Sequence, residues 1–151
     1  MKRILILFCL FCLFSCKSKK AVIEKSIVIV NLSDVDVAKK NRAYDVGQRL
    51  LETCNTSRFR PFSKEEATEK VIQNATIERI SATCKKINIR NGRFLSLNLI
   101  DVMHDEVNDQ YIFRYNIRYE KKYFKRELTV VVDPDNRVSA ISTKEVKPKP
   151  L

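Results

Sequence analysis

The chain has 151 residues, a length that fits one domain with a sizeable core. It carries 29 Lys and Arg against 18 Asp and Glu, a formal net charge of +11. Such an excess favours anionic partners, but its dispersal as short pairs is typical of a solvated surface. The only two glycines, Gly47 and Gly92, cannot build a glycine-rich phosphate cradle, which argues against a nucleotide-dependent enzyme.

The first 16 residues have the layout of an export signal. Lys2 and Arg3 form a positive region, and an apolar run at 4–14 follows them. A helix that spans a bilayer needs about 20 apolar residues, so this run is too short for a transmembrane anchor. Leu13 is also too bulky for the −3 position of an ordinary signal-peptidase site that would cut before Cys16.

Leu13 and Cys16 together make this stretch resemble the lipobox of bacterial lipoproteins. The resemblance implies a signal peptide at 1–15, cleavage before Cys16, and acylation of the Cys16 thiol. It therefore implies an exported protein held by lipid in the bacterial cell envelope. The sequence does not separate the inner from the outer membrane, and we favour the outer one.

A polar, basic linker is expected after the lipidated residue, at 16–31. Its Lys17, Lys19 and Lys20 are expected near lipid headgroups, where they either strengthen attachment to an anionic surface or serve as a solvated tether. Nucleic acid is not an expected partner, because the protein is exported and no RNA-binding signature lies among its basic residues.

Cys54 and Cys84 are the cysteines that remain after cleavage and acylation. Two thiols in an oxidising compartment suggest one disulfide, and two separate buried thiols are the alternative. These two cysteines are too far apart in the sequence, and His104 too isolated, for the paired-ligand pattern of a zinc site. No metal and no cofactor are therefore expected.

Two capping boxes predict the starts of helices. Ser33 with Asp36 begins a helix that runs to about residue 53. Ser63 with Glu66 begins helical structure that runs to about residue 88 and is interrupted near 74–76.

Two further features of the first half bear on packing. Gly47 lies inside the first helix, where it costs up to about 1 kcal/mol relative to Ala, and so indicates close packing or a strand that crosses that face. The β-branched run at 27–30 is either a strand or an apolar clasp on the domain.

After Gly92 the hydrophobic period changes to 2, which predicts a sheet. The four expected strands lie at about 94–103, 111–119, 124–132 and 137–144. Strict alternation on the first of these strands places Leu95, Leu97 and Leu99 on one face, opposite Phe94 and Val102.

Helices followed by four antiparallel strands predict an α+β domain at 32–146, with the N-terminal helices packed on a curved four-stranded sheet, and a tail at 147–151. This domain resembles the cystatin-like or nuclear transport factor 2-like fold. The residues that carry the resemblance are the segment at 92–94, the aromatic strand at 111–119 and the closing turn at 133–138. That resemblance implies a family of isomerases, dehydratases and many non-catalytic binding modules, so fold alone assigns no function.

The aromatic face of the 111–119 strand is the candidate binding site. Either the helices cover it as core, or part of it around Tyr115 and Tyr119 lines a pocket whose hydroxyls orient a ligand. The candidate pocket residues are Tyr111, Phe113, Tyr115 and Tyr119.

Catalytic residues are not expected. His104 lies in a predicted solvated hairpin loop, and no acid is in phase with the tyrosines. The leading interpretation is a non-catalytic domain that binds a protein partner or a small ligand. An enzyme of the same fold, and an accessory or immunity-type protein that acts through surface contacts, are the alternatives.

Overall fold

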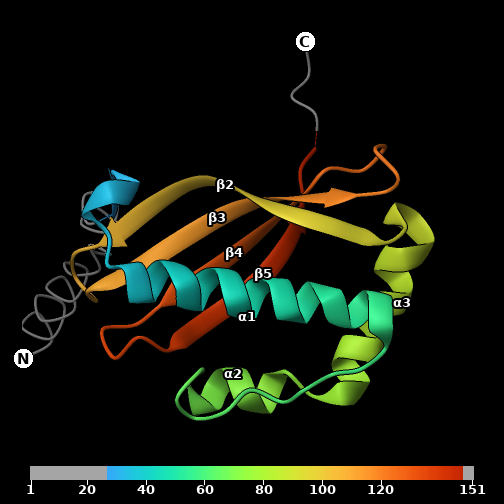
Figure 1. Cartoon of the computed structure of the whole chain (residues 1–151), viewed down its shortest axis with the longest axis horizontal. Coiled ribbons are helices and arrows are strands. Elements are labelled where there is room, and N and C mark those ends of the chain that lie inside the picture. Colours follow the sequence, from blue (N-terminus) through green and yellow to red (C-terminus); the bar gives the residue numbers. More distant parts are fainter. Residues whose placement is uncertain (1–26, 148–151) are drawn as a thin grey trace, which may run out of the picture.

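The computed structural model describes residues 27–147, which form an open antiparallel sheet with helices packed on one face (Figure 1). The strands are β1 (Ile27–Val30), β2 (Phe94–Asp105), β3 (Gln110–Tyr119), β4 (Arg126–Val132) and β5 (Val138–Glu145), in that spatial order. The helices are a 3-10 turn (Leu32–Asp34), α1 (Val37–Thr56), α2 (Glu69–Asn74) and α3 (Ile77–Asn91). The α+β class is confirmed.

The predicted signal peptide and the lipidated end of the linker lie outside the described residues. The same holds for the lipidation residue Cys16, for Lys17, Lys19 and Lys20, and for most of the expected tail. Within the described residues, no helix is long and apolar enough to cross a membrane.

The sheet has five strands, so the prediction of four is wrong. The additional strand β1 pairs with the far end of β2, from Ile27 opposite Asp105 to Val30 opposite Val102. Val30 packs against the hydrophobic core. A run of four residues is too short for its periodicity to distinguish a strand from a linker. Residues 27–30 form a strand because the edge of β2 offers them backbone hydrogen-bond partners. Residues 27–30, which we expected in the linker, therefore belong to the sheet.

The first helix starts later than its predicted capping box. Ser33 lies in the 3-10 turn, and Asp36 is the N-cap of α1, where its carboxylate accepts a hydrogen bond from the Ala38 N–H at 2.6 Å. A short acidic or hydroxyl side chain can cap at several nearby positions, so the sequence locates such a start only to within a turn.

The second capping box forms a turn instead of a helix. The Ser63 N–H donates to Glu66 Oε2 at 2.9 Å. The chain then runs alongside β5, because the Val138 N–H donates to Glu66 O and the Thr68 N–H donates to Val138 O. These tertiary hydrogen bonds delay α2 to Glu69. The predicted interruption near 74–76 is confirmed, since α2 ends at Asn74 and α3 begins at Ile77.

Two irregularities near Leu95 and Ile100 interrupt the pairing of β2 with β3. An extra residue in one strand moves all the following side chains to the other face. Phe94, Leu97 and Val102 are therefore all buried, whereas Leu95 is exposed. The expected grouping of Leu95 with Leu97 is wrong for this reason.

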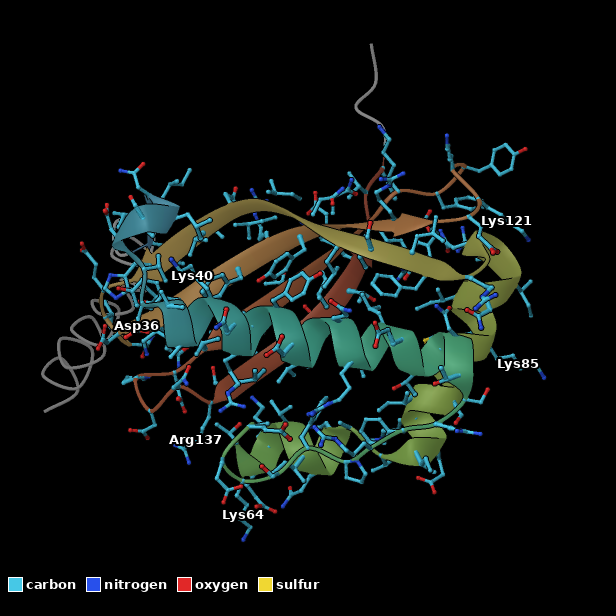
Figure 2. The ribbon with its side chains drawn as sticks, in the orientation of Figure 1. Asp36, Lys40, Lys64, Lys85, Lys121 and Arg137 are labelled. Carbon is cyan, nitrogen blue, oxygen red and sulfur yellow. A yellow bond between two sulfur atoms is a disulfide. The ribbon has the colours of Figure 1, made fainter. Side chains whose placement is uncertain are left out.

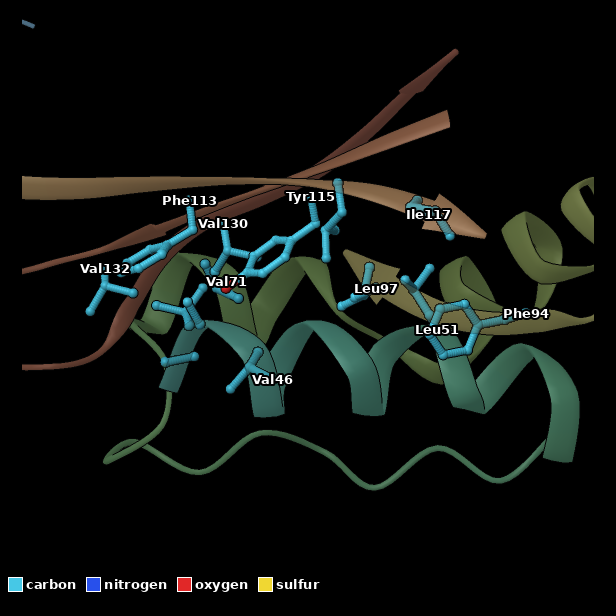
Figure 3. Packing of buried hydrophobic residues seen from close by; sticks show 14 of the residues in the cluster. Val46, Leu51, Val71, Phe94, Leu97, Phe113, Tyr115, Ile117, Val130 and Val132 are labelled. Carbon is cyan, nitrogen blue, oxygen red and sulfur yellow. The ribbon is translucent and has the colours of Figure 1, made fainter. Parts of the chain in front are cut away.

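The core lies between α1 and the sheet. Figure 3 shows Phe113 and Tyr115 of β3 directed toward the helix that carries Val46. A Cβ added to Gly47 would lie 2.7 Å from Leu128 Cδ2, so α1 approaches β4 closely at this glycine. The prediction of close packing at Gly47 is confirmed.

Charged side chains project from several elements around this core. Figure 2 shows Lys64, Lys85 and Lys121 at separate places on the periphery, and all three are exposed. On the face of the sheet away from α1, Arg114 forms a bidentate ion pair with Asp101, and its hydrogen bonds lower the pKa of the Asp101 carboxyl.

Candidate functional site

Most of the aromatic row of β3 is buried beneath α1. Phe113, Tyr115 and Tyr119 are 1%, 3% and 6% exposed. Burial raises the pKa of the Tyr119 phenol to about 12, and it raises the pKa of the Tyr115 phenol as well. No other described residue forms a hydrogen bond with the Tyr119 hydroxyl. These rings are thus surrounded by core side chains.

Tyr111 lies at the less buried end of the row. Its ring stacks on His104 with the centroids 4.5 Å apart, and Lys39 Nζ lies 5.8 Å from the Tyr111 centroid. His104 belongs to β2 and not to the predicted loop, and its Nε2 lies 2.9 Å from Asp109 Oδ1. The four candidate pocket residues Tyr111, Phe113, Tyr115 and Tyr119 line neither of the two cavities described next.

A partly open cavity of about 400 Å³ lies elsewhere, between β5 and the helices. Helices α2 and α3 form one wall, β5 forms the other, and the C-terminal half of α1 lies between them. The larger aliphatic side chains that line it are those of Leu50, Leu51, Val71, Ile80, Ile87 and Ile141. An apolar enclosure of this size is typical of a small-molecule site.

A disulfide between Cys54 of α1 and Cys84 of α3 forms part of this wall. The two Sγ atoms are 2.06 Å apart and the Cα atoms are 4.8 Å apart. Of the two alternatives for these cysteines, the structure has the bridge. A second cavity of about 160 Å³ lies against the same disulfide, since Cys54 and Cys84 line both cavities. The bridge therefore borders both cavities and holds α3 beside α1.

The charged side chains that line the larger cavity are both cations, Lys70 of α2 and Arg79 of α3. Arg79 Nη1 donates to Asn74 Oδ1 at 2.6 Å, so Asn74 holds the guanidinium across the interruption between the two helices. Neither cation forms an ion pair with a carboxylate of residues 27–147. The cavity therefore combines an apolar interior with a positive rim.

Two hydroxyl groups of the cavity, those of Thr83 and Thr143, are engaged with neighbouring groups. Thr83 Oγ1 donates to Arg79 O at 2.9 Å, and Thr143 Oγ1 accepts from Arg126 Nη2 at 2.9 Å. The lining contains no Asp, Glu or His that would act as a general acid or base beside them. Within residues 27–147, no three His, Cys, Asp or Glu side chains gather as a metal site. The arrangement is suited to holding an apolar body with an anionic end.

The chain was compared with protein-family models, curated proteins and solved structures, and none of them matches it. Sequence patterns did not single out Lys70, Arg79 or Ile141. The signal that was present is the helix interruption at 74–76, because Lys70 of α2 and Arg79 of α3 lie on either side of it.

Proposed function

We propose that this chain is a non-catalytic, lipid-anchored protein of the bacterial cell envelope whose α+β domain binds a small ligand with an apolar body. The observation that carries the binding function is the cavity between β5 and helices α2 and α3. Its volume of about 400 Å³ lies within the range of about 300–1,000 Å³ that is usual for ligand pockets. Its aliphatic lining favours an apolar ligand.

We also propose that the domain has the cystatin-like or nuclear transport factor 2-like fold. Two features support this assignment: the helices precede the antiparallel run from β2 to β5, and α1 lies across one face of the sheet. The support is architectural, and it is consistent with a binding module as well as with an enzyme.

An enzyme of the same fold would need a buried carboxylate opposite the tyrosine row. The charge of Asp45 contributes to the raised pKa of the Tyr115 phenol, but Asp45 lies on the exposed side of α1. Asp133 is buried at the turn between β4 and β5, where its Oδ1 accepts from the Arg137 N–H at 2.8 Å. Neither position supports catalysis at the tyrosines, so binding is the better-supported function.

An accessory protein that acts through surface contacts is the second candidate. The observation in its favour is the filled aromatic face, where Phe113, Tyr115 and Tyr119 are buried and line neither of the two cavities. Under this function the larger cavity would stay empty. Ligand occupancy of that cavity therefore discriminates the two candidates.

The experiment measures binding of the neutral fluorophore N-phenyl-1-naphthylamine, whose emission rises in apolar surroundings. The protein is the mature chain 16–151 with Cys16→Ser, which carries no lipid and needs no detergent. Saturable binding is expected. Ile141→Trp should weaken it by about tenfold, because the larger side chain fills the cavity from β5.

Asn116→Trp is the matched control, because Asn116 of β3 is exposed, lies between the buried Tyr115 and Ile117 and so points away from α1, and lines neither cavity. Thr83→Trp fills the cavity from α3. It should weaken binding as well, which tests the site independently if the Ile141→Trp protein fails to fold. The absence of saturable binding, or an equal loss with Asn116→Trp, would reject the proposed function.

A further inference from the structure

The positive rim of the larger cavity restricts the chemistry of its ligand. Lys70 and Arg79 come from either side of the interruption between α2 and α3, and they are the charged side chains of the lining. Because no carboxylate among residues 27–147 pairs with them, their charges remain available to a bound molecule. A ligand with a neutral end would leave these charges uncompensated, and a ligand with a cationic end would be repelled by them.

Arg79 is held in position before any ligand binds. Its Nη1 donates to Asn74 Oδ1 at 2.6 Å, and Asn74 Nδ2 in turn donates to Lys70 O at 2.8 Å. A guanidinium has five N–H donors, so the bond to Asn74 leaves donors for an anionic group. Its planar fork matches a carboxylate, and a nearby ammonium adds a second, flexible donor.

The interior selects a narrow apolar body. Ile80 and Ile87 of α3 face Ile141 of β5 across the cavity, with Leu50 of α1 between the two walls. The volume of about 400 Å³ lies near the low end of the range for small-molecule sites, about 300–1,000 Å³. One alkyl chain fits this space better than the two chains of a phospholipid.

Building on the proposed function, we propose that the cavity binds a single-chain anionic amphiphile, namely a long-chain monocarboxylate. Its carboxylate lies between Lys70 and Arg79, and its alkyl chain lies between β5 and α3. The charge at the rim orients the molecule, and burial of the chain supplies affinity. The disulfide between Cys54 and Cys84 forms part of the wall beside the chain.

The test is displacement of N-phenyl-1-naphthylamine from the chain 16–151 with Cys16→Ser, at ligand concentrations below aggregation. Dodecanoate and dodecanol have the same chain length and differ at the head group. Dodecanoate is expected to displace the fluorophore at a concentration about tenfold lower than dodecanol. Lys70→Gln with Arg79→Gln should remove this advantage and leave displacement by dodecanol unchanged.

The matched control is Arg58→Gln with Lys86→Gln, which removes the same charge from two exposed positions that do not line the cavity. This control should keep the preference for dodecanoate. Arg79→Lys should retain most of it, because the positive charge remains. Far-ultraviolet circular dichroism and urea unfolding of each variant verify the fold.

Two outcomes separate the inference from the function on which it rests. If the fluorophore binds and both ligands displace it equally, or if the control double variant loses the preference to the same extent, the anionic amphiphile is rejected while the ligand site stands. If the fluorophore does not bind at all, the proposed function itself fails.

Discussion

Gly47 shows how one residue controls the distance between a helix and the sheet. It lies in the middle of α1, where glycine is less favourable than alanine by about 1 kcal/mol. This cost is offset by the close approach of α1 to the sheet. An added Cβ would meet Leu128 Cδ2 at 2.7 Å, and Leu97 Cδ1 and Val130 Cγ2 at 3.5 Å each.

Gly47→Ala is expected to lower the free energy of unfolding by about 1–2 kcal/mol, because overpacking costs more than the helix propensity returns. Leu128 is completely buried, so its methyl group has little room to move. Urea denaturation measures the change. Asn41→Ala on the exposed side of α1 is the control, and it should raise stability by up to about 0.7 kcal/mol. Stabilisation by both substitutions would contradict the close approach.

Helix α3 is attached to the rest of the fold near its middle and at its C-terminal end. Near its middle, Cys84 is joined to Cys54 of α1, and Asn88 Nδ2 donates to Cys54 O at 2.7 Å. At its C-terminal end, Asn91 Nδ2 donates to Phe124 O at 2.9 Å, which fixes the helix to the segment between β3 and β4. The disulfide therefore constrains the side of α3 that lines the cavity.

Cys54→Ala with Cys84→Ala is expected to lower the free energy of unfolding by about 3–4 kcal/mol in the chain-entropy account, because the bridge closes a sequence separation of 30. Urea denaturation of the double variant measures this loss. Free-thiol labelling of the unfolded, unreduced wild-type protein is the accompanying check. Two reactive thiols there, or an unchanged urea midpoint in the variant, would contradict a stabilising bridge.

At the scale of the whole molecule, the proposed lipid anchor limits where the domain can lie. Residues 17–26 separate Cys16 from the first residue of β1. The distance from Cys16 to Ile27 is therefore at most about 40 Å when the chain is fully extended. A protein lipidated at Cys16 would therefore hold the β1 edge of the sheet near the membrane surface, whereas the ligand cavity lies beside β5 at the opposite edge.

Cys16→Ala is expected to leave an unprocessed precursor or a product that does not partition into membranes, because no thiol remains for acylation. Cell fractionation and the mass of the N-terminal fragment measure both effects. Cys12→Ala, within the predicted signal peptide, is the control and should mature and anchor as the wild-type protein does. Normal processing and membrane partition of the Cys16→Ala protein would reject the lipobox interpretation.

The α+β class, the four long strands and the interruption near 74–76 follow from local patterns. Alternation of apolar residues reports which side chains of one strand are buried, and Asn74 and Ile77 mark the helix boundaries. The cost of Gly47 inside α1 likewise indicated a close neighbour, although only the fold identifies Leu128.

Other features of the fold depend on contacts between segments that are distant in the sequence, and only the tertiary structure decided them. The free edge of β2 recruits β1, the irregularities near Leu95 and Ile100 let both ends of β2 face the core, and hydrogen bonds to Val138 delay α2. The larger cavity belongs to this group as well. A pattern in one segment describes its own buried face, whereas a cavity is the space that several segments fail to fill, and its position follows only when all of them are in place.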